Sequence, residues 1–223
     1  MTEVIEANES ELYVYLPHHG VYNPLKSSTK LRVVFNGSAS TSNGVSLHQI
    51  QLNGGTVQQD LFSIMIRFRK HEFVITADVR MMYRQILIHP DERDLQRIMW
   101  KEGPDQPSKA YQLNTITYST TSAPYLATRT LNQLVVDEKD TFLDASIIVQ
   151  SDCYMDDILT VSNPFENTKE LQTQLVQLLG RGGMTLHKWC SNNETRLNNI
   201  QNSGDYQFNN PSEMNTVKTL GVI

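Results

Sequence analysis

The chain has 223 residues, of which 39% are hydrophobic and 19% are charged, and its formal net charge is −5. This is enough apolar material for a core in one large domain or two small ones. The acidic balance weighs against nucleic-acid binding over the whole surface, so such a function must depend on local patches. No apolar run approaches the ~18 residues of a membrane span, and Cys153 and Cys190 indicate no metal site or disulfide framework. We therefore expect an intracellular protein without membrane contact.

The first half of the chain predicts strands around one helix. An acidic lead-in and a turn-rich extended stretch cover residues 1–29. Apolar residues at helical spacing predict a helix over Thr56–His71, with Thr56 as its N-cap. A short turn of helix and an extended piece follow over residues 81–94. Strands are predicted at Lys30–Phe35, which the turn cluster "NGSASTSNG" ends, and at Glu72–Val79, Leu95–Glu102 and Ala110–Tyr118.

The second half predicts two further helices between strands. One helix covers Ser122–Glu138, with Ser122 as cap and Pro124 in its first turn, and the other covers Phe165–Gly183. Strands are predicted at Ala145–Tyr154, Asp157–Ser162 and Val217–Ile223, with a polar, Asn-rich loop over residues 191–215. Helices among strands of mixed length predict an α+β fold with helices on one face of a sheet. Because the chain ends inside an apolar run, we expect it to be cut from a longer one.

The stretch "CYMDDILT", Cys153–Thr160, places two adjacent carboxylates between two strands. Residues 154–157 form a credible tight hairpin, although neither central residue is the glycine that such turns favour. Asp78, at the end of another strand, becomes a neighbour of Asp156 and Asp157 if that strand pairs with the hairpin. Three carboxylates from two segments form an oxygen-rich site suited to Mg²⁺, and two such ions can assist phosphoryl transfer. The alternative is a solvated hairpin tip with two exposed acids.

The order of motifs along the chain resembles that of reverse transcriptases. The series is an Asp on a strand, a Pro-containing helix entry, Tyr-x-Asp-Asp, Gly-x₅-Lys and Leu-Gly. The residues within these motifs resemble more closely still those of the Pao/BEL class of long-terminal-repeat retrotransposons. The resembling segments are Tyr15–Pro24, Thr29–Ala39, Gln58–His71, Thr76–Trp100, Tyr111–Leu131, Tyr154–Thr160, Gly182–Asn192 and Lys218–Ile223.

The resemblance implies the fingers and palm of a right-hand polymerase, with an antiparallel palm sheet backed by helices and no thumb in this chain. The implied domains are a lead-in at 1–14, fingers at 15–71 and 92–118, and palm at 72–91 and 119–223, which stops at the primer-grip hairpin. The implied activity is RNA-directed DNA polymerisation, in which a primer 3′-hydroxyl attacks the α-phosphate of a dNTP with two Mg²⁺ ions, for which Mn²⁺ is a substitute.

The resemblance also implies roles for single residues. Asp78, Asp156 and Asp157 are the catalytic and metal-binding carboxylates, and the Val79 carbonyl is a further metal ligand. Tyr83 matches the aromatic residue under the incoming sugar, where a ring excludes a 2′-hydroxyl; an ordinary core tyrosine is the alternative. The remaining implied contacts are Lys30, Arg32, Tyr118, Ser119 and Lys188 for the nucleotide, and Tyr154, Met155, Leu220 and Gly221 for primer and template.

Some of these assignments have simpler explanations. Lys30 and Arg32 alternate on a strand as triphosphate ligands would, but they equally fit a solvated edge, and a lone surface lysine would explain Lys188. Ser119 stands where the family usually carries Gly, and Asn36 where we expect an acid. The basic run Arg67–His71 suits template phosphates or a solvated helix end.

The implied partners are an RNA or DNA template with its primer, a dNTP, and the protease, RNase H and integrase domains of a polyprotein, none of which this chain contains. The implied location is the cytoplasm, with virus-like particles as one setting. Two other functions stay open: a catalytically inactive transposon remnant with at most weak nucleic-acid binding, and a Mg²⁺ protein that is not a polymerase.

Overall fold

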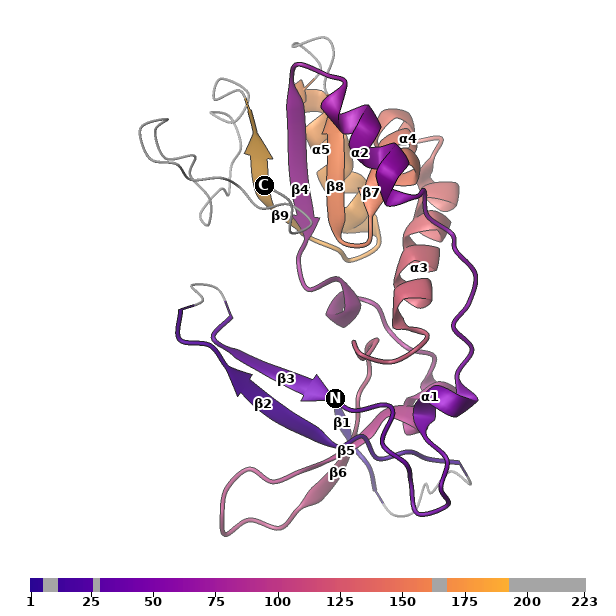
Figure 1. The fold of residues 1–223 in the computed structure, drawn as a ribbon, viewed down its shortest axis with the longest axis vertical. Helices are drawn as coiled ribbons and strands as arrows, with labels where there is room; N and C mark the ends of the chain where they lie inside the picture. Colours follow the sequence, from indigo (N-terminus) through magenta and orange to yellow (C-terminus); the bar gives the residue numbers. More distant parts are fainter. Residues whose placement is uncertain (6–11, 26–28, 162–167, 193–223) are drawn as a thin grey trace. The chain divides into compact units, whose positions relative to one another are not determined.

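The computed structural model describes residues 1–5, 12–25, 29–161 and 168–192. These residues form a mixed α/β structure with antiparallel sheets (Figure 1). The chain divides into two compact units, each of two segments: Met1–Gly55 with Tyr83–Ala127, and Thr56–Met82 with Thr128–Ile223. The bounds of these units do not coincide with the expected fingers and palm segments, whose assignment stays a prediction. None of the helices in the described ranges is long and apolar enough to cross a lipid bilayer.

The first unit contains two small antiparallel sheets. One sheet has the strand order β1-β6-β5, and the other is the β2–β3 hairpin. The bounds are β1 Thr2–Glu3, β2 His18–Tyr22, β3 Leu31–Phe35, β5 Arg97–Trp100, β6 Lys109–Gln112 and the short helix α1 Leu47–Ile50. Two 3-10 helices cover Met82–Gln85 and Pro90–Gln96, and α3 (Ala123–Glu138) belongs to both units. The predicted strand at residues 30–35 and the helix after Ser122 are confirmed.

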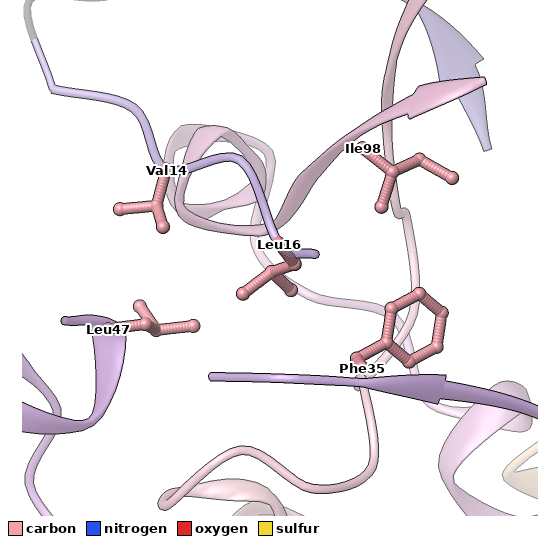
Figure 2. Packing of buried hydrophobic residues seen from close by; sticks show 5 residues of the cluster. All are labelled: Val14, Leu16, Phe35, Leu47 and Ile98. Carbon is pink, nitrogen blue, oxygen red and sulfur yellow. The ribbon is translucent and has the colours of Figure 1, made fainter. Parts of the chain in front are cut away.

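A cluster of five buried apolar residues forms a core of this first unit (Figure 2). Val14 and Leu16 alternate on an extended segment whose backbone pairs with the chain at Arg97: the Leu16 amide donates to the Arg97 carbonyl over 2.8 Å. Phe35 and Leu47 close the cluster from β3 and α1, and Ile98 from β5. The turn cluster after Phe35 reverses the chain, so that α1 packs against the β2–β3 hairpin and Leu47 is only 1% exposed.

The second unit is built on a four-stranded sheet of order β7-β8-β4-β9, in which all neighbours are antiparallel. Helices α2 and α4 pack on β7 and β8, and α5 packs on α4 (Figure 1). The bounds are α2 Leu61–Arg69, β4 Val74–Val79, α4 Leu143–Ser151, β7 Cys153–Tyr154, β8 Asp157–Val161, α5 Thr168–Arg181 and β9 Leu186–Ser191. The predicted strands ending at Val79 and starting at Asp157 are confirmed.

The central strand β4 has one closed face and one more open face. Ile75, Ala77 and Val79 are buried, whereas the alternating residues Val74, Thr76 and Asp78 are only half-buried. An antiparallel sheet commonly packs one face on the core and leaves the other accessible. Asp78 therefore lies on the more accessible face of the sheet.

The helix predicted from Thr56 begins later than expected, so Thr56 as its N-cap was wrong. The cap is Asp60, whose Oδ1 accepts from the Ser63 amide over 2.9 Å. The preceding residues are held extended by long-range hydrogen bonds: the Val57 carbonyl accepts from the Asn132 side chain over 2.6 Å, and the Gln58 side chain binds the Met155 amide over 3.0 Å.

The strand predicted at Ala145–Tyr154 was also wrong, since most of that stretch is the helix α4 and only Cys153–Tyr154 is a strand. The buried residues Ala145, Ser146, Ile148 and Val149 have helical spacing. A continuous apolar run has no period that separates a buried helix from a buried strand. The predicted final strand at Val217–Ile223 and most of the predicted Asn-rich loop lie outside the described residues.

Gly54 is expected to be the most sensitive glycine of the first unit. Its φ is +77°, and an added Cβ would lie 2.2 Å from Cγ of Tyr125. We expect Gly54→Ala to lower the free energy of unfolding by about 2–4 kcal/mol, through left-handed strain and the clash together. The matched control is Gly44→Ala, with a φ of +78° and nothing within 4 Å of the added Cβ, which should cost only about 1 kcal/mol of strain. Equal losses in urea unfolding would contradict the clash with Tyr125.

Candidate active site

The two adjacent carboxylates lie at a tight turn between β7 and β8, as predicted. Tyr154 pairs with Asp157 across the turn, and Met155, at its first central position, has a φ of +56°. Turns of this kind favour glycine at such a position, so Met155 is held in a strained conformation. The Gln58 side chain binds the Met155 amide, and the Val79 amide donates to the Asp156 carbonyl over 2.7 Å. The first bond ties the turn to the segment before α2, and the second ties it to the end of β4.

The register of the sheet brings Asp78 beside Asp157, as expected from the sequence. Asp78 pairs directly with Asp157 on β8 and with His187 on β9, and Asp157 pairs with Tyr154 on β7. Residues directly opposite each other on antiparallel strands project from the same face, with Cβ atoms roughly 4.5–5.5 Å apart. One row across the four strands therefore carries Tyr154, Asp157, Asp78 and His187 on one face.

A bulge in β9 gives Asp78 a second side-chain partner on that strand. The β4–β9 register shifts between Thr76 and Asp78, and Lys188 has a φ of +52°. Successive strand residues normally project to opposite faces, but a bulge changes the direction of a side chain. As a result His187 Nε2 lies 2.6 Å from one oxygen of Asp78, and Lys188 Nζ donates to the other over 2.8 Å.

The environment disfavours negative charge at the turn. The pKa of Asp156 is raised above its ordinary value, first because the carboxyl is partly desolvated and second because Asp78 is negative; Lys188 and His187 act in the opposite direction. The buried thiol of Cys153, beside the same turn, has its pKa raised to about 12 by burial and then by the aspartates. Clustered negative charge of this kind is found where a protein holds a cation or performs acid–base chemistry.

The fit of these residues to a metal ion is incomplete in this arrangement. Carboxylate oxygens are the ligands that Mg²⁺ prefers, and the strand register puts Asp78, Asp156 and Asp157 close together. Both oxygens of Asp78, however, are bonded to His187 and Lys188. Within residues 1–5, 12–25, 29–161 and 168–192, no group of three or more His, Cys, Asp or Glu side chains is arranged to hold a metal ion. The backbone thus suits a shared cation, whereas the side chains as placed do not form its site.

The other predicted site residues fall into two groups. Lys30, Arg32, Tyr83, Tyr118 and Ser119 belong to the first unit, so their meeting with the carboxylates of the second unit stays a prediction. Lys30 precedes β3 and Arg32 lies within it, and both are exposed. Tyr118 packs edge-on against Phe35 with ring centroids 5.5 Å apart. The predicted primer contacts Leu220 and Gly221 lie outside the described residues.

Ser119 has a backbone conformation that favours the glycine expected there. Its φ is +69°, and its carbonyl oxygen lies 2.9 Å from His48 Nε2. We expect Ser119→Gly to raise the free energy of unfolding by about 0.5 kcal/mol, because relief of left-handed strain exceeds the extra entropy of the unfolded glycine. Ser119→Ala keeps a Cβ and should give no gain in urea unfolding, so a gain from alanine would contradict the strain.

Two residues of this site were not predicted from the sequence. His187 stands beside the predicted Lys188, yet only pairing of β9 with β4 reveals that it contacts Asp78. Gln58, which supports the turn, lies 97 residues before Met155. In the predicted basic run, Arg67 is bonded to Asp152 over 3.2 Å and to the Ser151 carbonyl, so this arginine stabilises the end of α4.

Comparison with known proteins gives a likeness at the level of the fold. No protein-family model matches the chain, and no curated protein sequence is significantly similar to it. A solved structure that is similar is a prototype foamy virus protease-reverse transcriptase, a CSH mutant, with a TM-score of 0.57 and 16% sequence identity over 77% of this chain. The match covers 20% of the foamy virus chain, so the described chain corresponds to about a fifth of that protein. The chain therefore has a fold similar to part of a retroviral protease-reverse transcriptase.

Proposed function

We propose that this chain is the fingers and palm core of a reverse transcriptase, an RNA-directed DNA polymerase from a Pao/BEL-class retrotransposon polyprotein. It extends a primer 3′-hydroxyl with a dNTP on an RNA or DNA template. The observation that carries the proposal is the row across the sheet, in which Asp78 lies opposite Asp157 and beside the turn that holds Asp156. The fold similarity to a foamy virus protease-reverse transcriptase supports the same assignment.

In this proposal the carboxylates of Asp78, Asp156 and Asp157, with the Val79 carbonyl, bind divalent cations. Bound Mg²⁺ supplies positive charge against the developing charge of the transferred phosphoryl group. Lys188 and His187 both contact Asp78 in this arrangement. When a cation binds Asp78, Lys188 is released and becomes a proposed contact of the nucleotide phosphates. Strained residues support a functional role here, because Met81, Met155 and Lys188 have positive φ, and such strain is concentrated at functional sites.

The proposed nucleotide contacts of the first unit are Lys30 and Arg32 for the triphosphate, and Tyr83, Tyr118 and Ser119 for the sugar and base. Tyr154 and Met155 are proposed contacts of the primer and template. Because the chain matches only a fifth of its structural relative, we propose that it works within a longer polyprotein that includes protease, RNase H and integrase domains.

Primer extension by the purified chain tests this function. We expect template-directed addition of dNTPs to a DNA primer annealed to an RNA template, with Mg²⁺ or Mn²⁺, and no addition when EDTA removes the cation or when the template base does not match the dNTP. The four dNTPs supplied singly distinguish copying from untemplated addition. Absence of matched incorporation in both metals, from a chain with a cooperative unfolding transition, would contradict the proposal.

The second candidate is a catalytically inactive remnant with at most weak nucleic-acid binding. It is favoured by His187 and Lys188, which contact both oxygens of Asp78, and by a serine at a left-handed position where the family usually carries glycine. The same assay separates the candidates, since any matched incorporation eliminates the remnant.

A further inference from the structure

A pocket in the first unit is lined by none of the residues of the proposed carboxylate site. Its volume is about 480 Å³, within the range of roughly 300–1,000 Å³ that is usual for small-molecule sites. One wall is a single face of the β2–β3 hairpin, since His18, Val33 and Phe35 alternate along the paired strands. The opposite walls come from β5 and from the segment after β6. All residues that line the pocket belong to the first unit.

Aromatic rings form much of the lining. His18 lies between two of them, with ring centroids 6.0 Å from Phe35 and 6.2 Å from Trp100, and Tyr118 meets Phe35 edge-on. The rings of His18 and Trp100 are inclined by only 34°. Trp100 is nevertheless 44% exposed. Aromatic surfaces at these separations attract a further flat ring through stacked or edge contacts, so the lining suits a planar ligand.

Two polar side chains that line the pocket have no hydrogen-bond or ion-pair partner among the described residues. Thr117 is 3% exposed, and its buried hydroxyl has no hydrogen-bond partner in the described parts of the chain. Because this hydroxyl oxygen is inaccessible to water, a ligand in the pocket does not reach it, and polar recognition depends on Arg84. Arg84, from the 3-10 helix Met82–Gln85, is exposed and has no ion pair with the residues that the structure describes. It supplies a positive charge at the pocket.

We propose that this pocket is a binding site for a planar aromatic anion. The flat ring lies among His18, Phe35 and Trp100, and the anionic group of the ligand pairs with Arg84. The carboxylates and Lys188 take no part, although Tyr118, which also lines the pocket, is a proposed nucleotide contact. Binding is therefore measured as a Kd and not as polymerase activity.

A pair of fluorescent probes tests the site on the full chain. 1-Anilinonaphthalene-8-sulfonate carries a planar naphthalene ring and an anionic sulfonate, and N-phenyl-1-naphthylamine has the same rings without the sulfonate. We expect the sulfonate to bind at one site with a lower Kd than the amine. Arg84→Met should raise the Kd of the sulfonate by about threefold, as an exposed charge pair allows, and leave that of the amine unchanged. Thr117→Val removes a hydroxyl that the pocket does not expose and should leave the Kd of both probes unchanged.

The matched control is Arg129→Met, which removes an exposed arginine of α3 that is bonded to Gln133 and should leave both Kd values unchanged. Equal affinity of wild type for the two probes, several equivalent sites, or a loss in Arg129→Met as large as in Arg84→Met would overturn the proposal. Thr117→Val removes a hydroxyl without a partner and is not expected to unfold the chain, so urea unfolding of each variant excludes a general loss of structure.

Two competitors identify the source of the ligand. Displacement of the sulfonate by 2-naphthoate supports a simple aromatic acid, and displacement by deoxyguanosine monophosphate supports a nucleotide. If neither competitor displaces the sulfonate at concentrations a hundredfold above the Kd of the probe, the pocket binds only the probe. This result would overturn the proposal of a site for planar aromatic anions.

Discussion

Asp157→Asn is expected to reduce template-directed incorporation by about a thousandfold or more, because it removes one of the charges proposed to hold the catalytic cations. Asparagine has the shape of aspartate, so the backbone pairing of β8 with β4 and β7 is kept. The rate of single-nucleotide addition, measured with saturating dNTP and primer–template, gives the change in kcat. Asp78→Asn and Asp156→Asn should show losses of similar size.

The matched control is Asp140→Asn, in an exposed turn after α3, which should leave incorporation unchanged. Retention of more than about a tenth of the wild-type rate in Asp157→Asn would be too large for a metal-binding carboxylate and would reject the assignment. A reduced rate in Asp140→Asn would show that the assay responds to surface charge in general.

Loss of activity in the Asp156 variant is not expected to reflect unfolding. A carboxyl whose pKa is raised in the folded state adds stability below its unfolded pKa, and this contribution is lost as the pH rises through the folded pKa. The pKa of Asp156 is raised, first by partial desolvation, so at pH 7 its charge opposes folding. Asp156→Asn in metal-free buffer should therefore unfold at a urea concentration equal to or above that of wild type.

Arg97→Met is expected to cause the largest loss of stability in the first unit, about 2–4 kcal/mol, since it removes a buried arginine and leaves the half-buried carboxylate of Asp94 without its cation. Arg97 is 2% exposed, and its Nε donates to Asp94 over 2.6 Å. Its guanidinium lies 5.0 Å from the ring centroid of Tyr13. The Gln112 side chain also donates to Asp94, so the network joins the 3-10 helix to β5 and β6.

A double-mutant cycle isolates the ion pair from the packing of the arginine. Adding Asp94→Asn to Arg97→Met should recover about 2 kcal/mol, because the remaining amide carries no unpaired charge and still accepts from Gln112. The matched control is Lys109→Met, which breaks the exposed ion pair with Glu3 in the same sheet and should change stability little or not at all. Additive losses in the cycle would contradict the network.

The same ion pair predicts a loss of stability in acid. Burial alone would raise the pKa of Asp94, but the hydrogen bonds from Arg97 and Gln112 and the arginine charge hold it below its ordinary value of 3.8. A depressed carboxyl pKa contributes stability that is present above the unfolded pKa and is lost as the pH falls through the folded pKa. Wild type should therefore lose stability below about pH 4, and Arg97→Met should lose less over the same interval.

The parts of the fold that were predicted from the sequence have local signals. β3 ends at a cluster of turn residues, α5 ends at two glycines, and the pairing of Asp78 with Asp157 follows from a strand next to a hairpin. The wrong predictions concern segments whose structure has no local signal or depends on contacts distant in sequence. α4 is an apolar run without a period, and the start of α2 is set by bonds from Asn132 and Met155 to residues before Asp60. The contact of His187 with Asp78 accompanies a bulge in β9, and no local sequence pattern predicts that bulge.

The central position of β4 has a consequence for synthesis of the chain. Both of its partner strands follow it, and the first of them, β8, begins about 80 residues after Val79. At a synthesis rate of about 5–20 residues per second, β8 is made roughly 4–16 s after β4, and β9 later still. During this time neither edge of β4 is paired. An unpaired apolar strand is prone to pair with strands of other chains. Chaperones that bind the nascent chain, and a higher rate of translation, should therefore increase the fraction of this protein that reaches its native state.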